Sequence, residues 1–225
     1  MNTVIYTAIT DGKDGLKPAP VNAGASELVA FMDWQPLHNG NWDIRKAWDF
    51  EKSANRNAKI HKVMPHYWFP HAEYSLWIDG SVIVKPDFKL KPFIEYHLAE
   101  HDIAVFKHPI RDCAYQEGVE CLKLQLDETY TIASQMDRYN REGYPHNNGL
   151  AECTIILRRH SKLIENFNEL WWEEIKKGSH RDQLSFNYCL DRVGLSVKYF
   201  EGSVQTLPAL YPNMVGNAWF EYVGH

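Results

Sequence analysis

The sequence predicts an α/β protein with a mainly parallel, Rossmann-like sheet flanked by helices, in a single domain that spans residues 1–225. Short β-branched or aromatic segments alternate with longer helix-forming ones, which is typical of parallel strands joined by crossover helices. A chain of 225 residues with 44% hydrophobic and 24% charged residues suits one globular domain of this class. Ligands of such sheets bind beyond the carboxyl ends of the strands. Polar residues that follow strands are therefore the first candidates for a functional site.

The predicted strands are short apolar runs that end at polar or turn-forming residues. Residues 3–10 (TVIYTAIT) are β-branched and aromatic, and they run into the loop sequence DGKDG. Residues 74–83 (YSLWIDGSVI) form a strand that Asp79 and Gly80 interrupt. Further strands are predicted at residues 28–32, 103–106, 154–157 and 197–200.

The predicted helices lie between these strands. Residues 50–66 should form a helix with a basic face, and residues 113–139 either one long helix or a broken helical pair. Residues 144–149 (YPHNNG) are expected to form a turn. Other helices are predicted at residues 86–100, where a loop comes first, and at residues 161–177 and 181–193.

Composition disfavours several classes of function. The net charge of -5 and the lack of a basic run give no electrostatic footprint for nucleic acid or for a polybasic membrane anchor. No window reaches the roughly 20 apolar residues of a transmembrane helix, and no signal peptide is recognisable. The four cysteines form no CxxC pair, as expected for reduced thiols in a cytoplasmic protein. Without a Walker loop, GxGxxG or GxSxG motif, the chain does not read as an ATPase, a dinucleotide oxidoreductase or a serine hydrolase.

Asp79 is the strongest single candidate for a site residue. It ends an apolar strand, so its carboxylate should project into the crevice, and Gly80 lets the backbone approach a ligand closely. A nucleoside diphosphate needs its charge offset, usually by Mg²⁺ or Mn²⁺ held by carboxylates, or by Arg and Lys. A strand-ending turn with a solvated Asp fits the same residues, and spacing alone does not choose.

Basic residues on the helix predicted at 50–66 form a second candidate group. Arg56, Lys59 and Lys62 fall on neighbouring helical faces, and such a cluster can hold phosphates. A solvated basic face is the alternative interpretation.

Histidines offer a possible metal site. Imidazoles of His66, His71 and His108 could join Asp79 in binding zinc or manganese. They lack a helical ligand spacing, so we interpret them as structural or pocket-lining histidines.

Arg181, Asp182 and Gln183 lie at the predicted start of a helix. Side chains at that position either cap the helix or point into the crevice at the sheet edge. Both interpretations remain open from the sequence.

Aromatic residues are abundant, with 8 Trp and 12 Tyr. Aromatic rings fill cores, and they also stack on the apolar face of a pyranose in sugar-binding proteins. Candidates for such a contact are Tyr139, His146, Trp171 and Trp172. His146 belongs to a polar, turn-rich loop that is equally consistent with an ordinary loop.

Taken together, these segments resemble a glycosyltransferase-like domain family formerly of unknown function that includes a plant mucilage-related branch. The resemblance extends over about residues 3–190 and is carried by VIYTAIT, LVAFMD, RNAKIHKVMPHYWFP, YSLWIDGSVIV, FKHPIRDCAYQE, ASQMDRYNREGYP, LAECTIILRRH, WWEEI and RDQLSFNY. It implies a GT-A-type fold and a glycosyltransferase that moves a hexose-type sugar from a nucleotide-diphosphate sugar to a glycan or another acceptor.

The resemblance also implies residues for the donor nucleotide. In such enzymes the first strand and its loop hold the base and ribose, which here involves Thr7, Ala8, Thr10 and Asp33. The carboxylate motif holds a metal ion, Mn²⁺ or Mg²⁺, that binds the diphosphate, and this position corresponds to Asp79.

One departure from the usual motif affects this expectation. The motif is Asp-any-Asp, whereas this chain reads Asp79-Gly80-Ser81. Arg56 and Lys62 are therefore expected to share in binding the diphosphate.

The resemblance implies catalytic residues as well. Asp182 and Gln183 are similar to the Asp-Gln pair beside the donor sugar of glycogenin-like retaining transferases, which implies retention of configuration, with Arg181 in the same segment. Tyr139, His146, Trp171 and Trp172 would then bind a carbohydrate acceptor.

Two other functions remain possible from the sequence. A glycoside hydrolase needs two carboxyl groups roughly 5 to 9 Å apart, which Asp79 and Asp182 would supply. A non-catalytic glycan-binding homologue is suggested by the tryptophans and by the missing second Asp of the motif.

Overall fold

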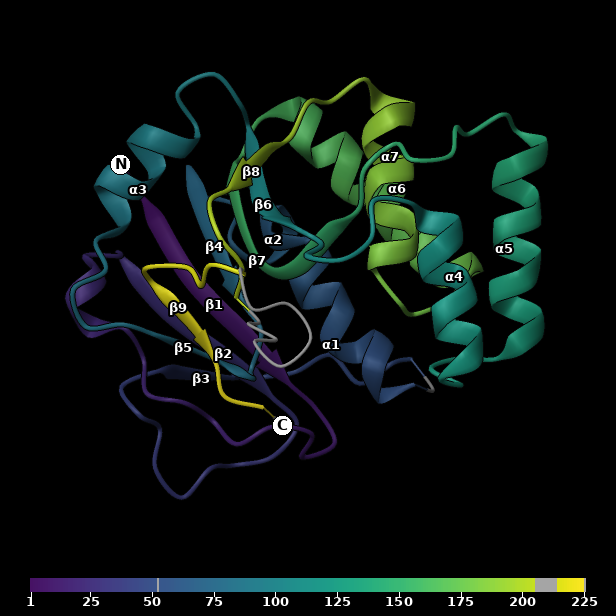
Figure 1. The fold of residues 1–225 in the computed structure, drawn as a ribbon. Coiled ribbons are helices and arrows are strands. Elements are labelled where there is room, and N and C mark those ends of the chain that lie inside the picture. Colours follow the sequence, from purple (N-terminus) through teal and green to yellow (C-terminus); the bar gives the residue numbers. More distant parts are fainter. Residues whose placement is uncertain (52, 205–213, 225) are drawn as a thin grey trace.

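The computed structural model describes residues 1–51, 53–204 and 214–224 and confirms the predicted α/β class (Figure 1). Seven strands form one sheet in the order β3-β2-β1-β4-β7-β6-β8, and β5 pairs with β9 in a small second sheet. The strands are β1 (Thr3–Ile9), β2 (Glu27–Met32), β3 (Asp43–Lys46), β4 (Tyr74–Ile78), β5 (Val82–Val84), β6 (Ile103–Lys107), β7 (Ala151–Arg159), β8 (Lys198–Phe200) and β9 (Phe220–Tyr222).

The direction of β7 determines which strand ends meet at the site. Strand β7 runs antiparallel to both of its neighbours, β4 and β6, whereas the other pairs of the large sheet are parallel. The amino end of β7 therefore lies at the same sheet edge as the carboxyl ends of β1, β4 and β6. The chain passes from β1 to β2 on one side and returns to β4 on the other, which makes this edge a switch point where ligands bind.

Helices cover the sheet and extend away from it. They are α1 (Ala54–Val63), α2 (Pro65–Trp68), α3 (Leu90–His97), α4 (Ala114–Lys123), α5 (Thr129–Arg141), α6 (Lys162–Lys177) and α7 (Gln183–Val193), with a short 3-10 helix η1 (Val21–Ala23). Helix α4 packs between α7 and α5, and α5 lies farthest from the sheet, at the right of Figure 1. None of the helices in the described ranges is both long and apolar enough to cross a membrane.

Side chains of the central strands alternate between two cores. Val4 and Tyr6 of β1 pack on one face in a cluster that includes Trp171 of α6, while Ile5 and Ile9 pack on the other face. Both faces of β1 are therefore buried, as a continuous apolar run predicts for a parallel strand between helical layers. Each such aliphatic side chain contributes about 1.5–3 kcal/mol through burial, which keeps the site edge rigid.

Most predicted elements are confirmed, and the exceptions have physical causes. Strands β1, β2, β6 and β8 and helix α6 lie within one residue of their predicted bounds, and residues 113–139 form the broken pair α4 and α5. The helix predicted at residues 50–66 was too long: it ends at Val63 because Met64 precedes a proline and leaves the helical region at φ -112 and ψ 50. The predicted strand at residues 74–83 splits between the two sheets as β4 and β5. Strands β3 and β9 were not predicted: β3 is a short edge strand with the mostly charged sequence Asp-Ile-Arg-Lys, and β9 is three residues long and pairs with β5, which is distant in sequence.

Candidate functional site

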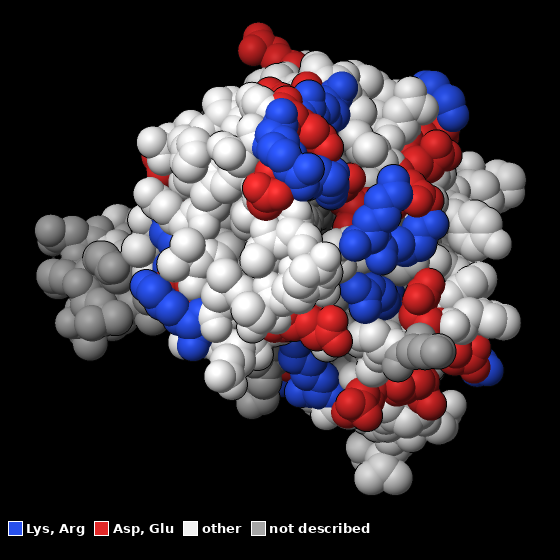
Figure 2. Space-filling model, turned by 90° about the vertical axis from the view of Figure 1, so that its right-hand side faces the viewer, with Lys and Arg blue, Asp and Glu red and all other residues white. Residues whose placement is uncertain are grey.

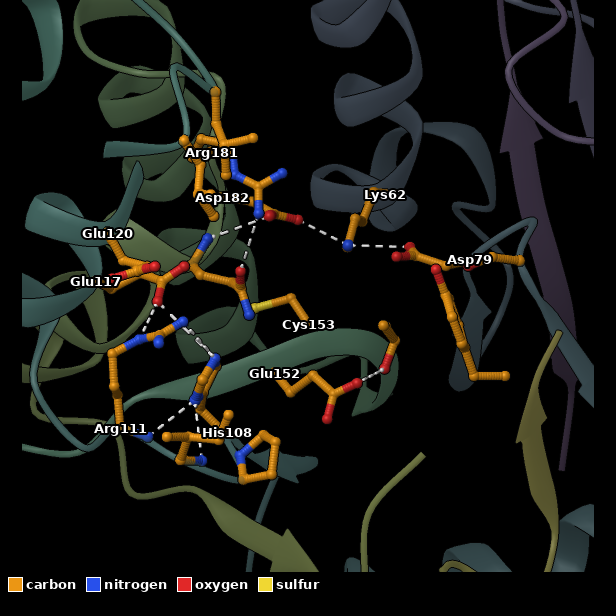
Figure 3. A pocket seen from close by; sticks show the side chains of 18 of the residues that line it. Lys62, Asp79, His108, Arg111, Glu117, Glu120, Glu152, Cys153, Arg181 and Asp182 are labelled. Carbon is orange, nitrogen blue, oxygen red and sulfur yellow. Dashed lines mark hydrogen bonds and ion pairs between the residues drawn. The ribbon is translucent and has the colours of Figure 1, made fainter. Parts of the chain in front are cut away.

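A polar cavity of about 320 Å³ lies at the ligand-binding edge of the sheet (Figure 3). It is bounded by the ends of β4 and β7, by α1, by the start of α7 and by the segment after β6. Of its twenty described lining residues, five are basic and five are acidic. The charged residues are Lys13, Lys59, Lys62, Arg111 and Arg181, and Asp79, Glu117, Glu120, Glu152 and Asp182.

Lys62 joins the two carboxylates predicted for the site. Its Nζ lies 3.0 Å from Asp79 Oδ1 and 2.7 Å from Asp182 Oδ2, and its side chain is 2% exposed (Figure 3). Burial alone lowers a lysine pKa, but Asp182 and Asp79 outweigh it and raise the pKa of Lys62. The ammonium therefore stays charged between the end of β4 and the start of α7.

Asp79 occupies the predicted position after β4. Its Oδ1 accepts hydrogen bonds from Lys62 Nζ and, at 2.6 Å, from Trp77 Nε1. The next residue must be small, because a Cβ built on Gly80 would lie 3.0 Å from the Asp14 side chain. Ser81, where the usual motif has a second carboxylate, is buried and lines the same cavity.

Asp182 combines both roles considered for it. Its Oδ1 accepts from the backbone N–H of Gln183 as the N-cap of α7, while Oδ2 binds Lys59 at 2.8 Å and Lys62. Burial raises the pKa of a carboxyl group, but the two lysines outweigh it and hold the pKa of Asp182 well below its usual range. Asp182 is thus a permanent anion at the cavity wall.

The other two residues of the segment also line the cavity. Arg181 Nη2 lies 3.4 Å from Gln183 Oε1, and its buried Nε has no hydrogen-bond partner among the described residues. Gln183 donates from Nε2 to the carbonyl of Ala151, at the start of β7. The structure therefore brings Asp79, Lys62, Arg181, Asp182 and Gln183 together, as the sequence predicted.

Glu152 was not predicted, and it is the most unusual acid in the cavity. It is 5% exposed, its Oε1 accepts from the Thr154 hydroxyl at 3.1 Å, and its Oε2 has no partner within the described ranges. Burial, with a smaller contribution from the charge of Asp79, raises the pKa of Glu152 to about 7. In Figure 3 its carboxyl group lies between the Lys62 and Asp79 side of the cavity and the His108 and Arg111 side.

A second charged group forms the wall opposite Lys62. Arg111 Nε donates to Glu117 Oε2 at 2.6 Å, and the backbone N–H of Arg111 donates to His108 Nδ1. Burial lowers the pKa of His108, so its ring is mainly neutral near pH 7 and can accept that hydrogen bond. This wall is electrically balanced and pre-ordered.

Of the four residues predicted to bind the nucleotide, Ala8 and Thr10 lie beside this cavity. Ala8 and Thr10 line a smaller cavity of about 80 Å³, which shares Lys13, Lys59 and Asp79 with the large one. Thr7 lines a third, narrow cavity near Trp42, and Asp33 is an exposed residue that accepts from the backbone N–H of Asp11. Two of the four therefore adjoin the main site.

Arg56 lies outside the main cavity, although it was expected to share in binding the diphosphate. Its guanidinium donates to the carbonyls of Ile175 and Gly178 at the end of α6, and it does not line the main cavity. It is held by orphan carbonyl groups of a helix terminus. Lys59, on the same helix, faces the cavity in its place.

Three aromatic residues predicted to bind an acceptor lie in the core. Tyr139 and Trp171 are 0% exposed and Trp172 is 7% exposed, so their rings offer no face to a sugar. The core alternative for these rings is thus correct. His146 is exposed and stacks on Tyr115 at 4.2 Å, outside the main cavity.

The histidines do not form a metal site with Asp79. His66 lies near Asn168 and His71 is exposed, so only His108 of the three reaches the cavity. The described residues contain no group of three or more His, Cys, Asp or Glu side chains that could hold a metal ion. Because Asp79 and Asp182 are bridged by an ammonium, the side chains present do not fit a divalent cation at Asp79.

Charges outside the cavity are mostly paired on the face that carries α4 and α5. Figure 2 shows Lys and Arg interleaved with Asp and Glu over this face, without a continuous field of one sign. Ion pairs within single helices, such as Arg141 with Asp137 and Lys123 with Glu120, contribute to this pattern.

Comparisons with known proteins agree with this fold. The profile of the TOD1/MUCI70 glycosyltransferase-like domain matches residues 38–206. The chain is 30% identical to "Probable hexosyltransferase MUCI70" of Arabidopsis thaliana over 87% of its own length and 38% of that protein. It is 27% identical to "Alkaline ceramidase TOD1" of Arabidopsis thaliana over 71% of its own length and 37% of that protein. The chain thus spans less than two fifths of either curated relative.

Solved structures of glycosyltransferases share the fold. A glycosyltransferase involved in the glycosylation of the major capsid of PBCV-1 aligns with a TM-score of 0.54 at 14% identity, over 99% of this chain and 93% of its own. The bifunctional glycosyltransferase WbbM aligns with a TM-score of 0.51 at 11% identity, over 88% of this chain and 38% of its own. With the profile match over most of the chain, we conclude that the protein belongs to the TOD1/MUCI70 glycosyltransferase-like domain family.

Proposed function

We propose that the protein transfers a hexose-type sugar from a nucleoside-diphosphate sugar to a carbohydrate acceptor. One observation carries the proposal: at the switch point of a glycosyltransferase-type sheet, a polar cavity places four cationic side chains around Asp79 and Asp182. These cations are Lys13, Lys59, Lys62 and Arg181. A diphosphate leaving group develops negative charge during transfer, and fixed cations in a partly dry site stabilise that charge.

We propose that the donor lies across the two adjoining cavities. We place the nucleoside toward Ala8 and Thr10, and the diphosphate beside Lys13 and Lys59, which both cavities share. The sugar then reaches the large cavity. In this arrangement the anomeric carbon lies near the start of α7.

Asp182 and Gln183 would face the sugar. Asp182 is ionised and held in place by two lysines, so the orienting of the donor sugar is the role we propose for it. Retention of configuration is our proposal for this pair. The anomeric proton coupling of the product in an NMR spectrum tests it directly.

Glu152 would bind a hydroxyl group of the acceptor or of the transferred sugar. Glu152 lines the cavity, its Oε2 has no hydrogen-bond partner among the described residues, and a pKa of about 7 lets the carboxyl group accept or donate a hydrogen bond near neutral pH. This role replaces the one expected of the buried tryptophans.

The name of one relative raises a different reaction, the hydrolysis of ceramide. A ceramidase must accommodate two long alkyl chains, whereas half of the lining residues of this cavity are charged. The cavity chemistry therefore favours a phosphate-bearing sugar donor over a lipid.

A ligand screen tests the proposal. Thermal shifts are measured with UDP, GDP, ADP and their hexose conjugates, because a ligand at 100 times its Kd adds about 2.7 kcal/mol to stability. Arg181→Gln should weaken binding by about 10- to 100-fold through loss of charged hydrogen bonds. Lys91→Gln, an exposed lysine on α3, is the matched control and should bind like the wild type. Equal affinity in Arg181→Gln would remove Arg181 from the donor site.

A further inference from the structure

We propose that this site binds the donor diphosphate without a divalent cation, with the Lys62 ammonium in the place between two carboxylates where a metal ion would sit. The inference rests on the proposed function, because it concerns the same donor site. It goes beyond that function by stating what neutralises the diphosphate.

The position of Lys62 is the first observation. A single buried ammonium contacts carboxylates from two different elements, Asp79 at 3.0 Å after β4 and Asp182 at 2.7 Å before α7. A divalent cation binds carboxylate oxygens at about 2.0–2.6 Å and would have to displace this ammonium to do so. A displaced ammonium would remain buried beside a dication, which is electrostatically unfavourable.

The occupancy of the carboxylate oxygens is the second observation. Asp79 Oδ1 already accepts from both Lys62 and Trp77, and Asp182 Oδ2 accepts from both Lys59 and Lys62. Asp182 Oδ1 accepts from the N–H of Gln183. Three of the four oxygens therefore already accept from N–H donors, and a divalent cation would have to displace these donors, Lys62 among them, to bind both carboxylates.

The sequence of the motif agrees with this geometry. Ser81 stands where a metal-binding motif supplies its second carboxylate, and it is buried with a neutral hydroxyl group. An anion placed at Ser81 would add negative charge beside Asp79. Because Ser81 is neutral, the positive charges of Lys59 and Lys62 equal the negative charges of Asp79 and Asp182.

The remaining cations supply the charge that a diphosphate needs. Lys13 lies at the rim, exposed, and no ion pair of its side chain is found in the described part of the chain. Arg181 has a buried Nε without a partner, and none of the described carboxylates forms an ion pair with it. Because Lys59 and Lys62 balance Asp79 and Asp182, Lys13 and Arg181 are the lining cations that remain for the diphosphate, and Glu152 opposes them as it ionises near pH 7.

Isothermal titration calorimetry distinguishes diphosphate binding without a divalent cation from binding that requires one. UDP, GDP and inorganic pyrophosphate are titrated into the wild type in EDTA, and again with Mg²⁺ or Mn²⁺. We expect the Kd of the bound probe to change by less than about threefold between these conditions. Binding that disappears in EDTA and returns with Mn²⁺ would overturn the inference while leaving the proposed function intact. No binding of any diphosphate in either condition would overturn both.

A lysine variant supplies a readout that does not depend on a donor. In Lys62→Met, Asp79 and Asp182 face each other without the ammonium, so Mn²⁺ should now bind and raise the Tm. The wild type and Lys91→Gln should show no Mn²⁺-dependent rise. A rise in the wild type would contradict the inference, and the titration of the wild type decides the question even if Lys62→Met does not fold.

Discussion

Lys62 and Glu152 are both buried in one cavity, but only Lys62 has partners of opposite charge that keep it ionised. Lys62 has two carboxylate partners, so its charge is maintained although its side chain is almost fully buried. Glu152 has no cationic hydrogen-bond partner among the described residues, and burial raises its pKa to about 7. The charge of Lys62 is therefore fixed, whereas the charge of Glu152 changes near neutral pH.

Glu152 makes stability depend on pH. Its folded pKa of about 7 exceeds the ordinary value of 4.5, so the stabilisation from proton uptake is complete below about pH 4.5 and is lost as the pH rises through 7. The loss is at most about 3 kcal/mol. Glu152→Gln should therefore be more stable than the wild type at pH 8, and its stability should vary less between pH 5 and 8. Urea denaturation across this range measures both effects.

Glu120→Gln is the control for this prediction, because Glu120 lines the same cavity and pairs with Lys123 at the surface. Its stability profile should follow that of the wild type. Parallel profiles for Glu152→Gln and the wild type would show that Glu152 does not titrate near pH 7. If Glu152 also binds substrate, Glu152→Gln should lower kcat/KM by about 10- to 100-fold.

The segment between α6 and α7 positions the residues that we propose to face the donor sugar. Ser179 N–H donates to Gln135 Oε1 of α5 at 2.8 Å, and the Ser179 hydroxyl and the His180 N–H both bind Asp127. These contacts lead directly into Arg181 and Asp182. The helical layer that lies away from the sheet therefore determines the geometry of the site.

A substitution at Gly178 tests whether the segment between α6 and α7 holds Arg181 and Asp182 in place. A Cβ at this position would lie 2.5 Å from Gln135 Oε1, so Gly178→Ala must displace Gln135 and break its bond to Ser179. We expect a loss of about 1–3 kcal/mol in the free energy of unfolding. Weaker nucleotide binding should accompany it, because the start of α7 shifts. Urea denaturation and titration with UDP measure the two effects.

Gly15→Ala is the matched control, since the nearest atom to its Cβ would be Lys17 Nζ at 4.0 Å. It should change stability little. A Gly178→Ala variant with the urea midpoint of the wild type would mean that Gln135 does not hold this segment.

The sequence predicted those candidate site residues whose position a local sequence pattern indicates. Asp79 and the segment from Arg181 to Gln183 were found because strand ends and helix starts face the crevice. Glu152 was missed because it lies at the amino end of β7, and the antiparallel direction of that strand depends on pairing across the sheet. A search of both ends of each strand would have found it.

For the whole molecule, the sequence predicts most strands and helices and the sheet edge that carries the cavity. It does not predict which side chains from different elements contact one another. The amphipathic spacing of α6 is compatible with Trp171 in the core or at a surface, and only the packing of α6 on α7 and the sheet decides between them. Arg56 and Lys59 lie on one helix, yet the end of α6 binds the first and Asp182 binds the second. The positions of Arg56 and Lys59 depend on contacts with residues more than 100 positions away.

The most direct test of the central claim is a transfer assay followed by mass spectrometry. The protein is incubated with a panel of UDP-, GDP- and ADP-hexoses and a mixture of oligosaccharide acceptors, with Asp79→Asn as the inactive reference. We expect one donor to yield its nucleoside diphosphate together with an acceptor heavier by one hexose-type residue, and Asp79→Asn to form neither product. Release of fatty acid from ceramide, or of free sugar from a glycoside without any nucleotide, in the absence of transfer would contradict it.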